Sequence, residues 1–232
     1  MITTRTVKQC GQADYGWLQA RYTFSFGHYF DPNLLGYASL RVLNQEVLAP
    51  GACFQPRTFP KVDILNLILE GEAEYRDSEG NHVQVAAGEA LLLATQPGVS
   101  YSEYNLGKEK SLTRLQLWLD ACPERENPAV QKIKLLPGKQ QLLASPDGEQ
   151  QSLQLRQQVR IHHLALKTGE ALDVRLNGPR AYLQSIHGAF RVLSGNEKYA
   201  LTCGDGAFIR DEANITLVAD APLRALLIDL PG

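Results

Sequence analysis

Turn-forming residues interrupt this chain at short intervals, and their spacing constrains the fold more than any other feature. Clusters such as Ala49-Pro50-Gly51, Gln96-Pro97-Gly98, Pro146-Asp147-Gly148 and Asn177-Gly178-Pro179 separate short apolar runs, of which Ile64–Leu69 is one. No stretch sustains a helical period of apolar residues. Many short strands joined by tight turns are typical of β-sandwiches and β-barrels. We therefore predict an all-β protein.

Length and charge limit the classes of function. The chain has 232 residues, 44% of them hydrophobic, and a formal net charge of −2, which suits one large core or two small ones. No block of Lys or Arg forms a nucleic-acid footprint, so we expect no nucleic-acid partner. The apolar run Ala90–Ala94 is too short to cross a bilayer, and Met1–Gln9 lacks the apolar core of a signal peptide. We expect a cytoplasmic protein without membrane contact.

The two halves of the chain repeat one pattern. Gly71-Glu72-Ala73 leads to Gly88-Glu89-Ala90, and Gly188-Ala189-Phe190 leads to Gly204-Asp205-Gly206 at nearly the same spacing. Each half reads as strand, turn, strand, Gly-acid turn and apolar strand. A fold built twice explains this pattern, and chance similarity between two hairpins is the alternative.

A polar segment with two prolines, Ala121–Ala129, lies between the halves. Such a segment is typical of a linker between domains. We predict an N-terminal domain over residues 1–120, a linker over residues 121–130 and a C-terminal domain over residues 131–232.

Short motifs along nearly the whole chain match one family pattern. They are Trp17-Leu18, Thr23-Phe24-Ser25-Phe26-Gly27, Tyr29-Phe30-Asp31-Pro32, Leu40-Arg41-Val42-Leu43-Asn44, Ala49-Pro50-Gly51, Leu69-Glu70-Gly71-Glu72, Arg76-Asp77-Ser78, Leu115-Gln116-Leu117-Trp118, Asp211-Glu212-Ala213 and Asp229-Leu230-Pro231. In these motifs the chain resembles the pirin family of bicupins. The resemblance implies two jelly-roll (cupin) β-barrels in one chain. It also implies that relatives include metal-dependent dioxygenases acting on flavonols such as quercetin, and transcription cofactors.

The resemblance also implies where a metal would bind. Members that hold a metal carry His-x-His before the Glu-Gly turn and His-x-Glu after the next Gly-acid turn. In this chain the four ligand positions hold Arg57, Phe59, Tyr101 and Glu103. A guanidinium cannot ligate a metal, a benzyl ring has no lone pair, and a neutral phenol is a poor ligand. We therefore expect no metal, no other cofactor and no catalytic residue.

Arg57 has two interpretations. It is either an anchor for a small-molecule or anionic ligand in the mouth of the first barrel, or the ion-pair partner of Glu103. The ion pair accounts for both residues, because a buried unpaired charge is costly. A paired guanidinium still has donors for a small anion.

The second barrel offers no comparable site. Counting from its glycines places Val174, Leu176, Leu217 and Ala219 at the corresponding positions. These side chains are apolar and predict a packed interior. His162-His163 is the one pair of adjacent histidines, and adjacent residues on a strand point to opposite faces.

The four cysteines form no C-x-x-C pair, so free thiols are expected. Cys53 and Cys203 adjoin strand patterns and are expected to be buried, whereas Cys10 lies in a polar stretch. Cys122 precedes Pro123 in the predicted linker, where solvent access favours oxidation to a sulfenic acid. A chemically quiet exposed thiol is the alternative.

Together these observations predict a monomeric pirin-like bicupin without a functional metal site. Its expected role is that of a non-enzymatic regulatory or redox-responsive protein, with Cys122 as the redox candidate. Monomeric behaviour is expected because one chain already supplies both barrels. Two alternatives stay open: an enzyme resembling quercetin 2,3-dioxygenase, and a protein-interaction module.

Overall fold

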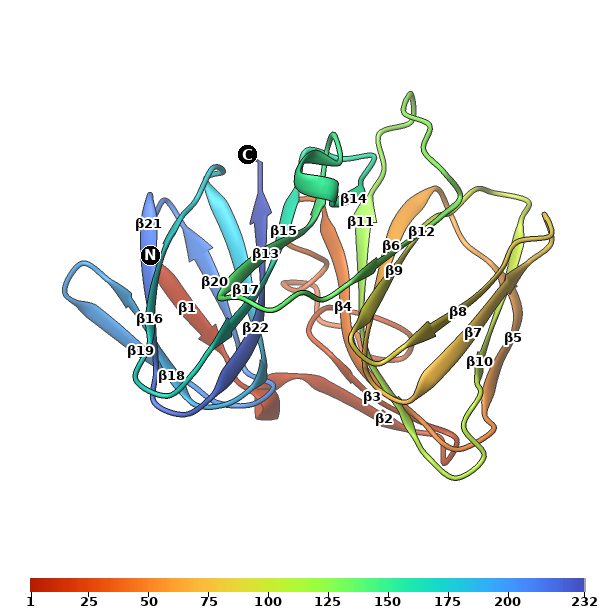
Figure 1. Cartoon of the computed structure of the whole chain (residues 1–232), viewed down its shortest axis with the longest axis horizontal. Coiled ribbons are helices and arrows are strands. Elements are labelled where there is room, and N and C mark those ends of the chain that lie inside the picture. Colours follow the sequence, from red (N-terminus) through yellow and green to blue (C-terminus); the bar gives the residue numbers. More distant parts are fainter. Residues whose placement is uncertain (232) are drawn as a thin grey trace. The chain divides into compact units, whose positions relative to one another are not determined.

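The regular secondary structure of the chain consists almost entirely of β-strands (Figure 1), which confirms the predicted all-β class. The computed structural model describes residues 1–231, and the helical segments among them are two short 3-10 turns, η1 (Val7–Gln9) and η2 (Glu149–Gln151). Neither of these turns has the length or apolar character needed to span a bilayer, within the part of the chain described. The strands divide between two compact units.

The first unit comprises Gly11–Leu135 and Leu153–Gln157. One of its sheets has the strand order β12-β9-β6-β11-β4-β3-β2, and the other has the order β5-β10-β7-β8. Strands that are distant in sequence, such as β4 and β11, are neighbours, as in a jelly roll. The strands of this unit are β2 (Gly11–Asp14), β3 (Leu18–Tyr22), β4 (Leu40–Leu48), β5 (Cys53–Thr58), β6 (Val62–Glu70), β7 (Glu72–Asp77), β8 (His82–Ala86), β9 (Glu89–Ala94), β10 (Ser100–Asn105), β11 (Leu112–Asp120), β12 (Val130–Lys134) and β14 (Leu153–Gln154).

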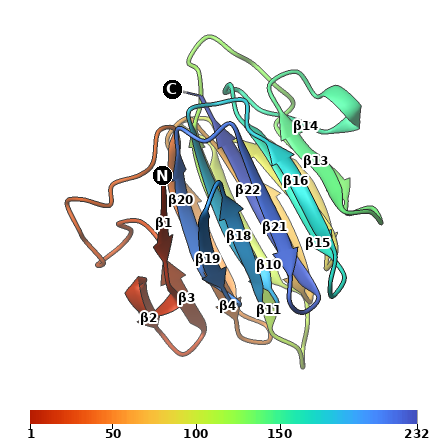
Figure 2. The ribbon, with the colours of Figure 1, turned by 90° about the vertical axis from the view of Figure 1, so that its left-hand side faces the viewer.

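The second unit comprises Met1–Cys10, Leu136–Ser152 and the chain from Gln158 onward. One sheet contains the order β1-β20-β17-β22-β15-β13, and the other is β16-β21-β18-β19, which lies in front in Figure 2. Its strands are β1 (Ile2–Arg5), β13 (Gln140–Ser145), β15 (Arg160–Leu166), β16 (Ala171–Arg175), β17 (Arg180–His187), β18 (Phe190–Ser194), β19 (Glu197–Leu201), β20 (Gly206–Arg210), β21 (Asn214–Ala219) and β22 (Leu223–Leu230).

The two units repeat one topology, as the sequence repeat predicts. The four strands β9-β6-β11-β4 of the first large sheet correspond in order to β20-β17-β22-β15 of the second large sheet. Gly71 and Gly188 follow β6 and β17 at φ +86° and +100°, where a glycine is favoured. A Cβ on Gly71 would lie 2.8 Å from the Ser111 carbonyl oxygen, and one on Gly188 would lie 2.2 Å from that of Pro222. Both glycines therefore let the chain pass close to the start of the central strand.

Each unit is therefore a cupin jelly roll, in which two separate sheets face each other across an apolar core. In the first unit Ile64 and Ile68 of β6 point into that core, and in the second unit Ala225 and Leu227 of β22 do so. Their spacing of two or four residues follows from the alternation of strand side chains.

The compact units do not coincide with the boundaries expected at residues 120 and 131. The N-terminal strand β1 pairs with β20 and belongs to the second unit. The end of the expected linker starts β12, which pairs with β9 in the first unit. Leu153–Gln157 also belongs to the first unit, because Arg156 is buried there against Asp63. Edge strands contributed from distant parts of the chain leave no mark in a local sequence pattern.

Candidate functional site

The four positions that the pirin resemblance assigns to metal ligands lie together in the first unit. Arg57 on β5 pairs in register with Tyr101 on β10. The Arg57 Nη2 atom lies 3.1 Å from Glu103 Oε2, so the predicted ion pair is confirmed. The rings of Phe59 and Tyr101 lie with their centroids 5.5 Å apart.

Glu103 has a second and more deeply buried partner, Arg114 on β11. The Arg114 Nη1 atom lies 2.6 Å from Glu103 Oε1, and Arg114 Nε donates to Glu46 Oε1 on β4 at 2.9 Å. The exposed fractions of Arg114, Glu46 and Glu103 are 2%, 3% and 6%. Arg57, Glu103, Arg114 and Glu46 thus form one line of alternating charge, here called the ion-pair line. It connects the two sheets of the first unit.

Two residues of this line, Glu103 and Arg114, have shifted pKa values, and in both the shift favours the charged form. Burial alone would raise the pKa of Glu103, but Arg114 and then Arg57 outweigh burial and hold that pKa below the usual glutamate value. Burial would lower the pKa of Arg114, whereas Glu103 and Glu46 raise it. The ion-pair line is therefore a set of satisfied charges and not a poised acid or base.

Phenylalanine rings pack against the two guanidinium groups of the ion-pair line. The Arg57 guanidinium lies 4.1 Å from the centroid of Phe54 and 5.0 Å from that of Phe59. The Arg114 guanidinium lies 5.2 Å from the Phe54 centroid. These distances are within cation–π range. The Tyr101 hydroxyl accepts a hydrogen bond from the Gln96 backbone N–H at 3.0 Å. Phe59 and Tyr101 therefore act as packing residues in this structure.

A row of amides lies beside the ion-pair line on the same face of the large sheet. Gln116 on β11 is paired in register with Asn44 on β4 and Asn66 on β6. Gln116 Nε2 donates to Asn66 Oδ1 at 2.9 Å, and Trp118 Nε1 donates to Gln116 Oε1 at 3.0 Å. Within residues 1–231, Asn44 Nδ2 and Oδ1, Asn66 Nδ2 and Arg57 Nε are buried without a hydrogen-bond partner. Such atoms are costly, and a water molecule or small polar ligand would satisfy them.

Sequence reasoning missed Arg114, Glu46, Asn44 and Asn66. A signal for them exists in the strand period. Leu112, Arg114, Gln116 and Trp118 occupy every second position of β11 and therefore share one face of the strand. On that face a charged group and an amide occupy positions where apolar residues are expected. Polar residues at inward-facing positions indicate a buried network.

The second unit fills the equivalent space with hydrocarbon. Its strand pairing equates Arg57, Glu103, Arg114 and Glu46 with Val174, Leu217, Ala225 and Leu164, all of which are core residues. The predicted packed interior is therefore confirmed. Two register predictions were wrong: Leu217 corresponds to Glu103 and not to Tyr101, and Ala219 corresponds to Asn105 and not to Glu103. Counting from the glycines fails here because the loop before β21 is shorter than the loop before β10.

Three of the four cysteines differ from the prediction. Cys203 was expected to be buried but is exposed, because it lies in the turn between β19 and β20. Cys53, also expected to be buried, is half-buried, and Cys122, expected to be exposed, is half-buried as well. Cys10 is buried, and no disulfide links any of these residues in the described chain.

The backbone of Cys122 is tied to a buried arginine. Its N–H donates to the Arg156 carbonyl oxygen at 2.7 Å. The Arg156 side chain has no exposed surface; its Nε lies 2.8 Å from Asp63 Oδ1, and its Nη2 donates to the carbonyl oxygens of Val62 and Thr95. Arg156 therefore anchors Leu153–Gln157 in the first unit, and Cys122 lies directly beside this anchor.

The adjacent histidines have different surroundings, as predicted for neighbours on a strand. His162 Nδ1 lies 3.3 Å from Gln140 Nε2, whereas His163 Nε2 accepts from Arg224 Nε at 3.3 Å. Among residues 1–231, no group of three or more His, Cys, Asp or Glu side chains is placed to hold a metal ion.

Comparison with known families gives two matches that together cover most of the chain. Residues 3–119 match the Pirin family model, and residues 142–230 match the model of the quercetinase C-terminal cupin domain.

Two curated proteins of Escherichia coli K12 are similar over the full length. The chain is 79% identical to the pirin-like protein YhaK over 232 residues, which is 100% of both chains. It is 34% identical to a quercetin 2,3-dioxygenase, over 100% of this chain and 99% of that protein.

Solved structures agree with these similarities. The crystal structure of Escherichia coli YhaK is matched with a TM-score of 0.83 over 97% of this chain and 99% of that one. The nickel(II) complex of the Escherichia coli pirin YhhW, at 32% identity, is matched with a TM-score of 0.93 over 100% of this chain and 99% of that one.

Proposed function

Because the chain belongs to the pirin family of bicupins, we propose that it is a member without metal chemistry that acts as a non-enzymatic, redox-responsive regulatory protein. The observation that carries this proposal is the engagement of the Glu103 carboxylate by two guanidinium groups, those of Arg114 and Arg57. Glu103 is the one residue of metal-ligand type among the four positions taken from the resemblance.

The side chains at these positions do not fit a divalent transition metal. Imidazole nitrogens and carboxylates are the usual ligands, and Arg57 supplies a fixed positive charge in their place. A dication beside Glu103 would lie close to two guanidinium groups, and the buried location would screen the repulsion poorly. Phe59 offers no lone pair, and the pKa of Tyr101 is raised by burial, which favours the neutral phenol.

The redox part of the proposal rests on Cys122. The thiolate would attack hydrogen peroxide, the O–O bond would break, and a sulfenic acid and water would form after proton uptake. Half-burial permits contact with a small oxidant. The hydrogen bond from the Cys122 backbone to Arg156 places the modified residue beside the anchor of Leu153–Gln157. An added oxygen would therefore act beside a segment that Arg156 anchors to Asp63, Val62 and Thr95.

Mass spectrometry after graded peroxide treatment tests this assignment. Oxidation of Cys122 at lower peroxide than Cys203 supports it, and Cys203→Ser serves as the matched control because Cys203 is the exposed cysteine. Prior oxidation of Cys203, or equal oxidation of all four cysteines, would remove the proposed redox site.

The similarity to a quercetin 2,3-dioxygenase keeps an enzymatic alternative. Oxygen uptake with quercetin and added divalent metal, abolished by Glu103→Gln, would favour that alternative. A binding partner recovered in stoichiometric amount by the reduced protein would instead favour an interaction module.

We further propose a monomeric cytoplasmic protein with a small-anion site at Arg57. The Arg57 side chain is 32% exposed and contacts Glu103 through Nη2, which leaves other donors of the guanidinium for a small anion. Light scattering tests the monomer, and titration with halide or phosphate, with Arg57→Met as the control, tests the anion site.

A further inference from the structure

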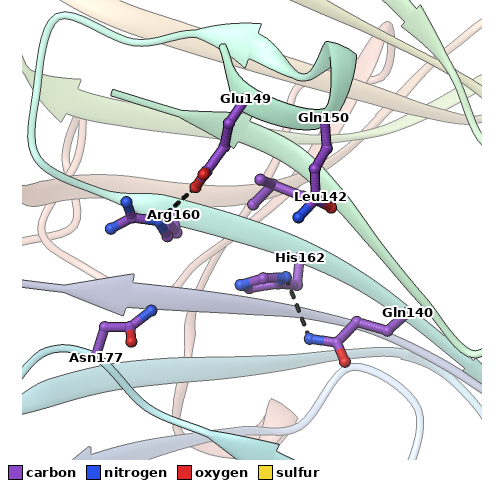
Figure 3. A pocket seen from close by; sticks show the side chains of 7 residues that line it. All are labelled: Gln140, Leu142, Glu149, Gln150, Arg160, His162 and Asn177. Carbon is purple, nitrogen blue, oxygen red and sulfur yellow. Dashed lines mark hydrogen bonds and ion pairs between the residues drawn. The ribbon is translucent and has the colours of Figure 1, made fainter. Parts of the chain in front are cut away.

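A polar pocket of about 370 Å³ opens in the second unit (Figure 3). It is lined by residues of β13 and β15, by the turn η2 and by Asn177 from the β16–β17 turn. On β15, Arg160 and His162 lie on the same face of the strand as Leu164 and Leu166, which belong to the core. The pocket is therefore the polar end of the space between the two sheets.

Hydrogen bonds fix the orientation of its main donors. Gln140 Nε2 lies 3.3 Å from His162 Nδ1, which orients the imidazole ring toward the amide. Arg160 Nε donates to Glu149 Oε1 at 3.0 Å. Asp229 accepts from the backbone N–H groups of Asn177 and Gly178 at 2.7 and 2.9 Å, which holds the turn that carries Asn177.

The pocket carries no net charge. Arg160 and Glu149 neutralise each other. Burial lowers the pKa of His162, and nearby Arg160 adds to this effect while Asp229 and Glu149 oppose it, so the imidazole is neutral near pH 7. The remaining polar lining consists of the neutral amides of Gln140, Gln150 and Asn177.

The loop above the pocket is strained and locked in place. Gln150 and Gln151 have φ values of +53° and +62°, in a backbone region that residues other than glycine rarely adopt. The loop is held because Ser145 Oγ lies 2.8 Å from Ser152 Oγ, and Ser152 Oγ donates to the Glu149 carbonyl at 2.6 Å. Strained backbone that is held by its surroundings is frequent at ligand clamps. In Figure 3 the side chain of Gln150 points into the pocket.

We propose that this pocket binds a small neutral polyhydroxy compound, a monosaccharide or polyol. Planar amide, guanidinium, carboxylate and imidazole groups offer the mixed donors and acceptors that neighbouring hydroxyl groups need. Leu142 supplies an apolar wall for the C–H groups of such a ligand. The volume is in the range of small-molecule sites. This inference is independent of the proposed redox function.

Charged ligands fit less well. An anion attracted by Arg160 would also meet the carboxylate of Glu149. A zwitterionic amino acid would have to separate these two side chains in order to pair with both. A neutral polyhydroxy ligand can hydrogen-bond to both groups while their ion pair stays intact.

Saturation-transfer NMR on the full-length protein tests the proposal with D-glucose, D-galactose, D-mannose, D-xylose, D-mannitol and myo-inositol as probes. D-glucuronate and L-glutamate serve as charged comparisons. We expect at least one neutral probe to bind with a Kd of about 1 mM or tighter. The same probe should bind at least about tenfold more weakly to His162→Phe and to Gln150→Gly, a loss of about 1.4 kcal/mol.

Two controls keep the result interpretable. Gln150→Gly removes the amide but relieves the left-handed strain, so its Tm should not fall below that of the parent protein. His82→Phe changes a half-exposed histidine of the first unit and should leave probe binding unchanged. Failure of every neutral probe to bind, preference for the charged compounds, or binding unaffected by both pocket variants would overturn the proposal.

Discussion

Arg114 and Glu103 lie on opposite sheets of the first unit and are joined by an ion pair with an N···O distance of 2.6 Å. The equivalent residues of the second unit, Ala225 and Leu217, are both core hydrocarbons. The same topology is thus built once around buried charge and once around an apolar core. The apolar residues of the second unit therefore indicate which substitutions will measure the contribution of the ion-pair line to stability.

Removing Glu103 should leave two guanidinium groups without their shared partner. Glu103→Gln should destabilise the protein by about 3–5 kcal/mol, the usual range for breaking a buried pair. In double-mutant cycles by denaturant unfolding, the coupling of Glu103 to Arg114→Met should exceed its coupling to Arg57→Met, because the Arg57 side chain is 32% exposed and the Arg114 side chain 2%. Equal couplings, or no coupling to Arg114, would contradict this ranking.

Replacing the buried charges together should cost less than removing one of them. The triple change Glu46→Leu, Glu103→Leu and Arg114→Met imitates the apolar interior of the second unit, and such exchanges are often neutral or stabilising. We expect its free energy of unfolding to exceed that of Glu103→Gln. A triple variant less stable than the single one would show that volume or amide contacts outweigh the charge effect.

The lowered pKa of Glu103 predicts an acid-side loss of stability. The folded state holds this carboxyl below its unfolded pKa, so the stabilisation is full above the usual glutamate pKa and is lost as the pH falls through the folded value. The difference in free energy of unfolding between the parent protein and Glu103→Gln should therefore shrink in acid. Unfolding by urea at a series of pH values below neutrality measures it, and a difference that grows in acid would have the wrong sign.

His163 predicts a second pH dependence. Burial, with a contribution from Arg224, lowers its pKa from 6.5 to about 4. The folded state then binds fewer protons than the unfolded state in this window, so stability falls as the pH drops from about 6.5 to about 4. The total effect is on the order of 3 kcal/mol. His163→Gln keeps an acceptor for Arg224 but cannot titrate, and its stability should be flatter over this range. Parallel curves for the two proteins would exclude the effect.

Introducing imidazoles should create a metal site if the four positions are correctly assigned. The combined change Arg57→His, Phe59→His and Tyr101→His leaves Glu103 in place on β10. We expect isothermal titration to detect Ni²⁺ binding to this variant and none to the parent protein. Affinity should rise further with Arg114→Met, because Arg114 competes for the Glu103 carboxylate. A folded triple variant without any binding would show that the ligand positions are misassigned.

Local pattern predicted the fold well, because turn residues and strand alternation act over a few neighbours. The equivalence of Gly71 and Gly188 could be read directly, since both are required by positive φ and a close backbone approach. The pairing of Arg57 with Glu103 was predictable from the resemblance. Arg114 was not, because its partners come from β10 and β4, 11 and 68 residues away in the chain.

Exposure of the cysteines was the weakest prediction. Cys203 adjoins a strand but lies in the turn that follows β19, and one residue of shift separates a buried position from an exposed one. The burial of Arg156 also left no local sign, because its partners Asp63 and Thr95 precede it by 93 and 61 residues.

We propose that the first unit holds a line of paired charges, and no metal, at the positions that the pirin resemblance assigns to metal ligands. Elemental analysis of the protein, produced in metal-supplemented medium and purified without chelator, tests it most directly, with the Escherichia coli pirin YhhW prepared in parallel. We predict transition metal far below one atom per chain for this protein and near-stoichiometric metal for the relative. About one iron, nickel, copper, zinc or manganese atom per chain, lost on Glu103→Gln, would contradict the claim.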